Sequence, residues 1–190
     1  FYRYYAGYPL NFGEWARRKL ELPADASVVD PWNGSGTTAA ACARMGVSCQ
    51  GYDINPVMVH LGRARVASSS DFGEAAELID TVDEILANRI TPTVSEVGAA
   101  FRAIPVGNEA AHSIAITALF PVARRLVQES KTKNPSWFRK GTTLRNEILA
   151  RDFLLESWRS YIAQVGLWRS THEDPDGFTI SIERGDSRKS

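Results

Sequence analysis

The sequence predicts an α/β fold: part of a doubly wound parallel sheet that carries a large helical insertion. Three observations predict it. Strand and helix patterns alternate over residues 27–66, helical apolar spacing dominates from about 70 to 170, and an alternating strand pattern returns at 178–183. We therefore expect residues 1–69 and 176–190 to form the sheet domain, with 176–190 holding its third strand, and residues 70–175 to form the insertion.

The first part of the sheet domain alternates helices with strands. Residues 12–20 have apolar side chains spaced for one helix face, and residues 27–30 are typical of a short buried strand. A glycine loop leads into a helix at about 37–45, an alternating strand follows at 47–53, and a helix runs from about 56 to 66. A strand, helix, strand order implies a right-handed crossover and parallel pairing.

Cap residues support these helix bounds. Gly46 stands where a helix end favours a left-handed residue. Asn55 and Pro56 are typical of an N-cap and a first helical position. Beyond residue 70 we expect helices at about 72–86, 109–130 and 142–166.

Composition excludes some function classes. Apolar residues make up 44% and charged residues 23%, and no apolar run approaches the ~20 residues that span a bilayer, so we expect a cytoplasmic protein without a membrane partner. Cys42 and Cys49 have no histidine at ligand spacing. We expect both to be buried as small apolar residues, and we expect no metal site.

Charge is distributed unevenly along the insertion. Residues 71–120 carry eight acids and two bases, a net −6, whereas residues 121–151 carry eight bases and two acids, a net +6. Cations attract phosphates, and aromatic rings can stack on nucleic-acid bases or wedge between them. This basic stretch is therefore a candidate nucleic-acid surface. The alternative is a solvated basic helix face with its aromatic residues in the core. The candidate residues are Lys131, Lys133, Trp137, Arg139 and Lys140.

The glycine loop "DPWNGSGTT" limits which ligand can bind. A P-loop needs a Lys before its Ser or Thr, and Gly36 is followed directly by Thr37. A dinucleotide loop is matched only in its loose form, and the carboxylate of Asp30 would oppose a pyrophosphate by about a kcal/mol or more when partly desolvated. The same carboxylate favours an ammonium or sulfonium group. S-adenosylmethionine carries both positive centres and no phosphate.

Acids at the ends of three predicted strands fit that cofactor. Asp53 ends the second strand, 17 residues after Gly36, where acids accept hydrogen bonds from ribose hydroxyls. Asp186 follows the third strand and could accept from the adenine amino group. Each acid also has a plainer interpretation: Asp30 as the start of an Asp-Pro turn, Asp53 as a helix cap, and Asp186 as a surface loop acid.

The loop "DPWNGSGTT" closely resembles the Asp-Pro-Phe-x-Gly-Ser-Gly-Thr-Thr signature of DNA amino-methyltransferases, which methylate adenine N6 or cytosine N4. "GVSCQGYDINPVMVHLGRAR" is similar to the second motif of that family, "RYYAGYPLNFGEWA" to its methionine-side segment, and "IERGDSRKS" to its adenine-side motif. The resemblance implies a class I (Rossmann-like) methyltransferase fold that binds S-adenosylmethionine. The cofactor-binding residues that it implies are Tyr5, Ala6, Gly7, Phe12, Asp30, Pro31, Trp32, Gly34, Gly36, Thr37, Asp53, Ile54 and Asp186.

One family motif is absent. The catalytic tetrapeptide Ser/Asp/Asn-Pro-Pro-Tyr/Phe contacts the target amine, and no Pro-Pro pair occurs in this sequence. We therefore expect the cofactor-binding part of a DNA methyltransferase, either a fragment or one half of a split enzyme whose second chain carries that motif. The alternatives are an RNA or protein N-methyltransferase and a catalytically silent module that binds the cofactor or scaffolds a partner. The sequence specifies neither the target base nor the oligomeric state.

Overall fold

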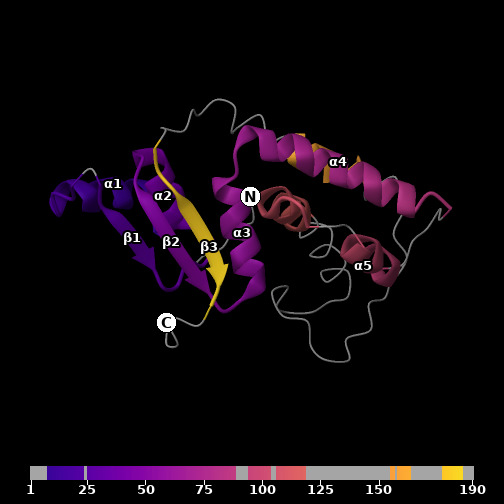
Figure 1. Cartoon of the computed structure of the whole chain (residues 1–190), viewed down its shortest axis with the longest axis horizontal. Coiled ribbons are helices and arrows are strands. Elements are labelled where there is room, and N and C mark those ends of the chain that lie inside the picture. The colour runs from indigo at the N-terminus through magenta and orange to yellow at the C-terminus, as the bar shows by residue number, and fades with distance from the viewer. Residues whose placement is uncertain are drawn as a thin grey trace. The chain divides into compact units, whose positions relative to one another are not determined.

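Outside the basic stretch of residues 121–151, the computed structural model describes most of the chain. The described residues fall in seven ranges: 8–23, 25–88, 94–103, 106–118, 155–156, 158–163 and 177–185. These residues fall into two compact units. The first holds the described residues up to Ser69 together with 177–185, and the second holds those from Ser70 to residue 163. Figure 1 labels strands β1 to β3 and helices α1 to α3 of the first unit, and α4 and α5.

The first unit contains a three-stranded parallel sheet with the order β1-β2-β3. β1 spans Ser27–Asp30, β2 spans Ser48–Asp53, and β3 spans Ile180–Arg184. The register places Asp30 opposite Gly51, and β3 lies beside β2 although the whole insertion separates them in sequence. The predicted α/β class and its parallel pairing are thus confirmed, and β3 begins two residues later than predicted.

Three helices accompany this sheet: α1 (Leu10–Lys19), α2 (Thr37–Met45) and α3 (Pro56–Val66). α2 and α3 contact the sheet and each other, and α1 packs against α2. The predicted bounds of α2 and α3 are confirmed. α1 begins two residues earlier than predicted because Pro9 takes the N-cap position, where its carbonyl accepts the N–H of Phe12 at 2.9 Å.

The predicted caps are present. Gly46 follows α2 with a φ of 63°, in the left-handed region where glycine avoids the strain of a Cβ. Asn55 caps α3 because its side chain accepts the N–H of Val57 at 3.0 Å, with Pro56 as the first helical residue. Local turn chemistry therefore sets these helix ends.

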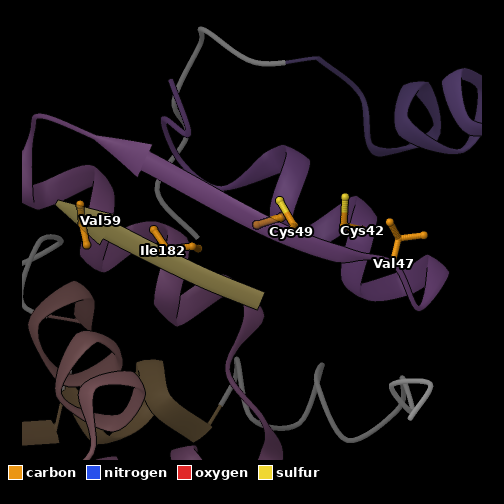
Figure 2. Close-up of a cluster of buried hydrophobic side chains, with 6 residues drawn as sticks. Cys42, Val47, Cys49, Val59 and Ile182 are labelled. Atoms are coloured by element: carbon orange, nitrogen blue, oxygen red, sulfur yellow. The ribbon is translucent and has the colours of Figure 1, made fainter. Parts of the chain in front are cut away.

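One apolar cluster holds the helices on the sheet. Figure 2 shows Cys42 of α2, Cys49 of β2, Val59 of α3 and Ile182 of β3 in this cluster. Each fully buried aliphatic side chain of this size stabilises the fold by about 1.5–3 kcal/mol. Because one cluster joins both helices to one sheet face, α2 and α3 cover the same face. On the opposite face Val29 of β1 is 60% exposed.

The two cysteines lie in that cluster, as predicted. Both are buried and free. A hydrogen bond with Cys42 and burial together raise the pKa of the Cys49 thiol. Cys49 therefore behaves as a small apolar core residue rather than as a nucleophile.

The described residues of the second unit are helical except for 86–88 and 106–108. It contains α4 (Ser69–Ile85), α5 (Val94–Ala103) and helical residues at 109–118 and 155–163, with residue 157 outside the description. Trp158 is fully buried, and its indole N–H donates to the carbonyl of Ala115 at 2.8 Å. α5 was not among the predicted helices, although its apolar residues are spaced for one helix face.

Part of the acidic stretch has a structural role in this unit. The side-chain N–H₂ of Asn108 donates to the carboxylates of Asp71 and Glu74, each at 2.9 Å.

Among the described residues, no three His, Cys, Asp or Glu side chains lie close enough together to hold a metal ion. Nor does any described helix combine the length and apolar character needed to cross a membrane.

α3 lies close to the glycine loop where Gly36 meets Gly62. A Cβ built on Gly36 would lie 2.7 Å from the Cα of Gly62, closer than real Cβ contacts. The φ of Gly36 is 78°, which favours glycine for a second, independent reason. Gly36 is therefore required both by its own backbone and by its neighbour.

We predict that Gly36→Ala lowers the free energy of unfolding by roughly 2 kcal/mol or more, because it adds a backbone clash to a strained φ. Gly73→Ala is the matched control: Gly73 lies exposed in α4 with nothing within 4 Å of a built Cβ, and this change should be neutral or stabilise by up to ~1 kcal/mol. Urea unfolding followed by circular dichroism measures both. Equal stability of the two variants would contradict the close approach.

Candidate functional site

A surface pocket of about 570 Å³ opens over the glycine loop, at the carboxyl end of β1. This volume lies within the usual range for ligand sites, and ligands of parallel α/β sheets bind at that edge. Most of the lining belongs to the loop and to the first turn of α2. The lining residues are Tyr8, Val29, Asp30, Trp32, Asn33, Gly34, Ser35, Thr37 and Thr38.

Asp30 presents its carboxylate in the wall of this pocket. One oxygen accepts the N–H of Trp32 at 3.0 Å, and the other accepts the hydroxyl of Thr38. The oxygen of Thr38 lies 2.6 Å from the phenolic oxygen of Tyr8, so phenol, hydroxyl and carboxylate form one chain. Burial and the nearby Asp30 carboxylate raise the pKa of Tyr8, whereas its hydrogen bond to Thr38 opposes this shift. Asp30 thus both starts the Asp-Pro turn and faces the pocket.

Asp53 ties the glycine loop to the end of β2. Its Oδ2 accepts the N–H of Gly34 at 2.9 Å, and its Oδ1 accepts the N–H of Asn55 at 2.8 Å. It does not line the pocket. Each carboxylate oxygen can accept a second hydrogen bond, so this structural role leaves room for a ligand donor.

Asn33 supports the loop from inside. It is 4% exposed, and its side-chain N–H₂ donates to the carbonyl of Gly34 at 3.1 Å. A Cβ on Gly51 or Gly62 would lie 2.6 or 2.5 Å from the Asn33 side-chain amide, so both glycines make room for it. No described residue donates to its Oδ1. The residue at this loop position is therefore a core residue, which the sequence did not indicate.

Arg65 reaches the loop from α3. Its Nη1 donates to the Thr37 hydroxyl oxygen at 3.1 Å and lies 3.5 Å from both the carbonyl oxygen and the Oγ of Ser35. Burial lowers the pKa of the Arg65 guanidinium, which remains charged at neutral pH, and the neighbouring Tyr8 opposes this shift. A half-buried cation therefore stands behind the same loop that Asp30 precedes.

The structure brings together only some of the predicted binding residues. Asp30, Trp32, Gly34 and Thr37 line the pocket, and Trp32 is 81% exposed. Phe12 does not line it; its ring packs on Trp15 at a centroid distance of 5.6 Å and on Tyr8 at 5.0 Å. Four other predicted residues adjoin the loop or β2 without lining the pocket: Pro31, Gly36, Asp53 and Ile54.

The remaining predicted residues lie outside the described part of the chain. This applies to the cofactor-side residues Tyr5, Ala6, Gly7 and Asp186, and to the nucleic-acid residues Lys131, Lys133, Trp137, Arg139 and Lys140. Their assigned roles stay predictions.

Six residues in or beside the pocket were not among the predicted binding residues: Tyr8, Val29, Asn33, Ser35, Thr38 and Arg65. Ser35 and Thr38 belong to the loop motif itself, so their hydroxyls were visible signals. Tyr8 precedes α1; the N-terminal tyrosines were open to either a stacking or a packing role, and the contact of Tyr8 with Thr38 places it at the pocket. Arg65 had no local signal, since basic residues are common near helix ends.

No protein-family model matches this chain, and no curated protein and no solved structure is significantly similar to it.

We predict that Asp53→Ala destabilises the fold without any ligand, by about 1–3 kcal/mol, because it leaves two backbone N–H groups without their acceptor. Asp53→Asn keeps one acceptor oxygen and should cost less than Asp53→Ala. Thermal or urea unfolding of the two variants measures this difference. If Asp53→Ala unfolds at the same denaturant concentration as the wild type, Asp53 does not hold the loop.

Proposed function

We propose that this chain binds S-adenosylmethionine in the pocket over the glycine loop, as the cofactor-binding part of a class I methyltransferase. The proposed acceptor is an exocyclic amine of DNA, adenine N6 or cytosine N4. When bound, the cofactor would supply a methyl group on a sulfonium centre. The observation that carries the proposal is the Asp30 carboxylate in the pocket wall, next to the loop.

The donors and acceptors around the pocket fit a cationic ligand. Asp30 places a negative charge in the pocket wall just before the glycine loop, a position where a phosphate-binding loop carries no acid. Thr38 orients this carboxylate by donating a hydrogen bond to it. A phosphate placed there would meet like charge in a partly desolvated setting. The ammonium and sulfonium groups of the cofactor would be attracted instead.

The second strand supports the same assignment. Asp53 ends β2 and is bonded to Gly34, so the candidate ribose acceptor and the loop are held in fixed register. This is the position at which acids of related sheet topologies accept from ribose hydroxyls. Asp53 is therefore preorganised, with acceptor capacity to spare.

The acceptor half of the proposal rests on the motif resemblance. The loop and second motif are those expected of DNA amino-methyltransferases, and a basic segment with Trp137 follows in the insertion. Because the sequence contains no Pro-Pro pair, methyl transfer by this chain is proposed to need a second polypeptide or segment with the catalytic tetrapeptide.

We predict that isothermal titration calorimetry detects S-adenosylmethionine binding to the chain, and that Asp30→Asn weakens it by about tenfold or more, as expected for loss of a charge-assisted contact. Asparagine still offers an acceptor to the N–H of Trp32, so the turn should survive. S-adenosylhomocysteine is the control ligand, because it keeps the ammonium but lacks the sulfonium charge. No binding at millimolar cofactor, or tighter binding of a dinucleotide, would contradict the cofactor assignment.

The DNA assignment predicts binding to duplex DNA with a steep salt dependence. Four cations of the basic stretch are replaced by Gln. The plot of log K for DNA binding against log salt concentration should become shallower by about 3–4, because each phosphate contact contributes ~0.9 to its slope. The changed residues are Lys131, Lys133, Arg139 and Lys140, and the control replaces the exposed cations Lys19 and Arg44. Equal slopes for both sets would contradict this surface, and a preference for RNA would favour the alternative acceptor.

A further inference from the structure

Tyr8, Phe12 and Trp15 form an aromatic row along α1 that reaches the pocket at one end. Tyr8 lines the pocket, and the ring of Phe12 packs edge-on against it at a centroid distance of 5.0 Å. The indole of Trp15 stacks on Phe12 at 5.6 Å, with an interplanar angle of 28°. The aromatic row therefore starts at the proposed binding site and runs outward along the helix.

The outer end of the aromatic row faces solvent. Trp15 is 57% exposed and Phe12 48%, and no residue of α1 is buried. The helix meets α2 through Gly13, where a built Cβ would lie 2.6 Å from the Cβ of Ala41. Trp15 lies two residues beyond Gly13, roughly 200° around a helix of 3.6 residues per turn, so it lies on the side away from this contact. The fold thus leaves more than half of the indole surface open to a ligand.

The area of the aromatic row is small for a protein interface. Buried aromatic side chains contribute about 150–250 Å² each, so the exposed parts of Phe12 and Trp15 amount to about 200 Å². A stable protein interface buries roughly 800 Å² on each partner. The exposed rings therefore fit a smaller, flat ligand better than a second folded protein.

The charge of α1 favours a polyanion. Its last turn holds three basic residues, and its first turn holds no acid. Arg18, three residues beyond Trp15 and so its neighbour on the helix surface, is 81% exposed. Its guanidinium lies 3.7 Å from the carboxylate of Glu14, an exposed pair of the kind that contributes little. Open aromatic faces beside cations are the combination that binds single nucleic-acid strands, because rings stack on the bases and cations attract the phosphates.

We propose that the aromatic row is a stacking surface for unpaired bases of a DNA strand. Trp15 is the stacking contact, Phe12 is the positioning ring behind it, and Arg18 attracts the adjoining phosphate. Because the aromatic row ends at Tyr8 in the pocket wall, a strand held on it would pass its next nucleotides over the pocket. This inference rests on the proposed DNA acceptor and adds a contact that reads no sequence, since every base has a π-face.

The test is binding of the full chain to a labelled oligothymidine of about 12 nucleotides, followed by fluorescence anisotropy over a range of salt concentrations. Trp15→Ala should weaken binding about tenfold, as expected for loss of one stacked base. Trp15→Phe keeps a ring and should lose less than threefold. The slope of log K against log salt concentration should stay the same for Trp15→Ala, because stacking releases no counterion. Arg18→Gln should make that slope shallower by about 0.7.

Leu20→Ala is the matched control for loss of an exposed apolar side chain. Leu20 is 68% exposed at the C-cap of α1. It lies five residues beyond Trp15, roughly 140° around the helix, and therefore off the aromatic row. This variant should bind the oligonucleotide as the wild type does.

The outcomes separate this surface from the proposed function. Equal binding by Trp15→Ala and the wild type would overturn the inference and leave the proposed function standing. A wild-type chain that binds no oligonucleotide at low salt would overturn both the inference and the DNA acceptor, whereas calorimetry with S-adenosylmethionine reports separately on the cofactor. Tighter binding of oligouridine would assign the surface to RNA and overturn the DNA strand.

Self-association is the competing explanation for exposed rings. If Trp15→Ala dissociates a dimer in analytical ultracentrifugation without weakening oligonucleotide binding, the aromatic row is an interface between copies of the chain, and the stacking surface is overturned. Circular dichroism checks that each variant is folded. Trp15→Gln provides a second variant without a ring if Trp15→Ala unfolds.

Discussion

The contact between Gly36 and Gly62 is the constraint on which the rest of the site depends. It lets α3 approach the loop more closely than any side chain would allow, and Gly62 also leaves space for the buried amide of Asn33. Packing at this distance brings Arg65 to the hydroxyls of Ser35 and Thr37. Arg65, which no sequence pattern singles out, thereby places a positive charge beside the loop.

Asp53 adds a second restraint from the other side. By accepting the N–H groups of Gly34 and Asn55, it joins the loop, the end of β2 and the start of α3. Such a loop loses little conformational freedom when a ligand binds, so more of the contact energy is available for affinity. The same bonds mean that removing Asp53 changes the protein before any ligand arrives. Asp30→Asn, which keeps the turn, is the cleaner probe of the pocket.

The sequence predicted the elements whose signals are local. α2, α3 and the parallel order of the sheet could be predicted from the two strand patterns, from Gly46 and from the Asn55-Pro56 cap. α5 was missed although its apolar residues recur at helical spacing. The pocket was only partly predictable: Asp30 and Gly34 stand out in the motif, whereas Tyr8 and Arg65 meet the loop from about 30 residues away in sequence. Contacts of that kind depend on helix packing, which no local pattern records.

The proposed binding of S-adenosylmethionine at the glycine loop can be tested by titrating ¹⁵N-labelled chain with the cofactor and following the amide chemical shifts. We expect saturable shifts at Gly34, Gly36 and Thr37, with the α4 amide of Gly73 unchanged as the internal reference. Saturable shifts that avoid the loop, or no shifts at millimolar cofactor, would contradict it.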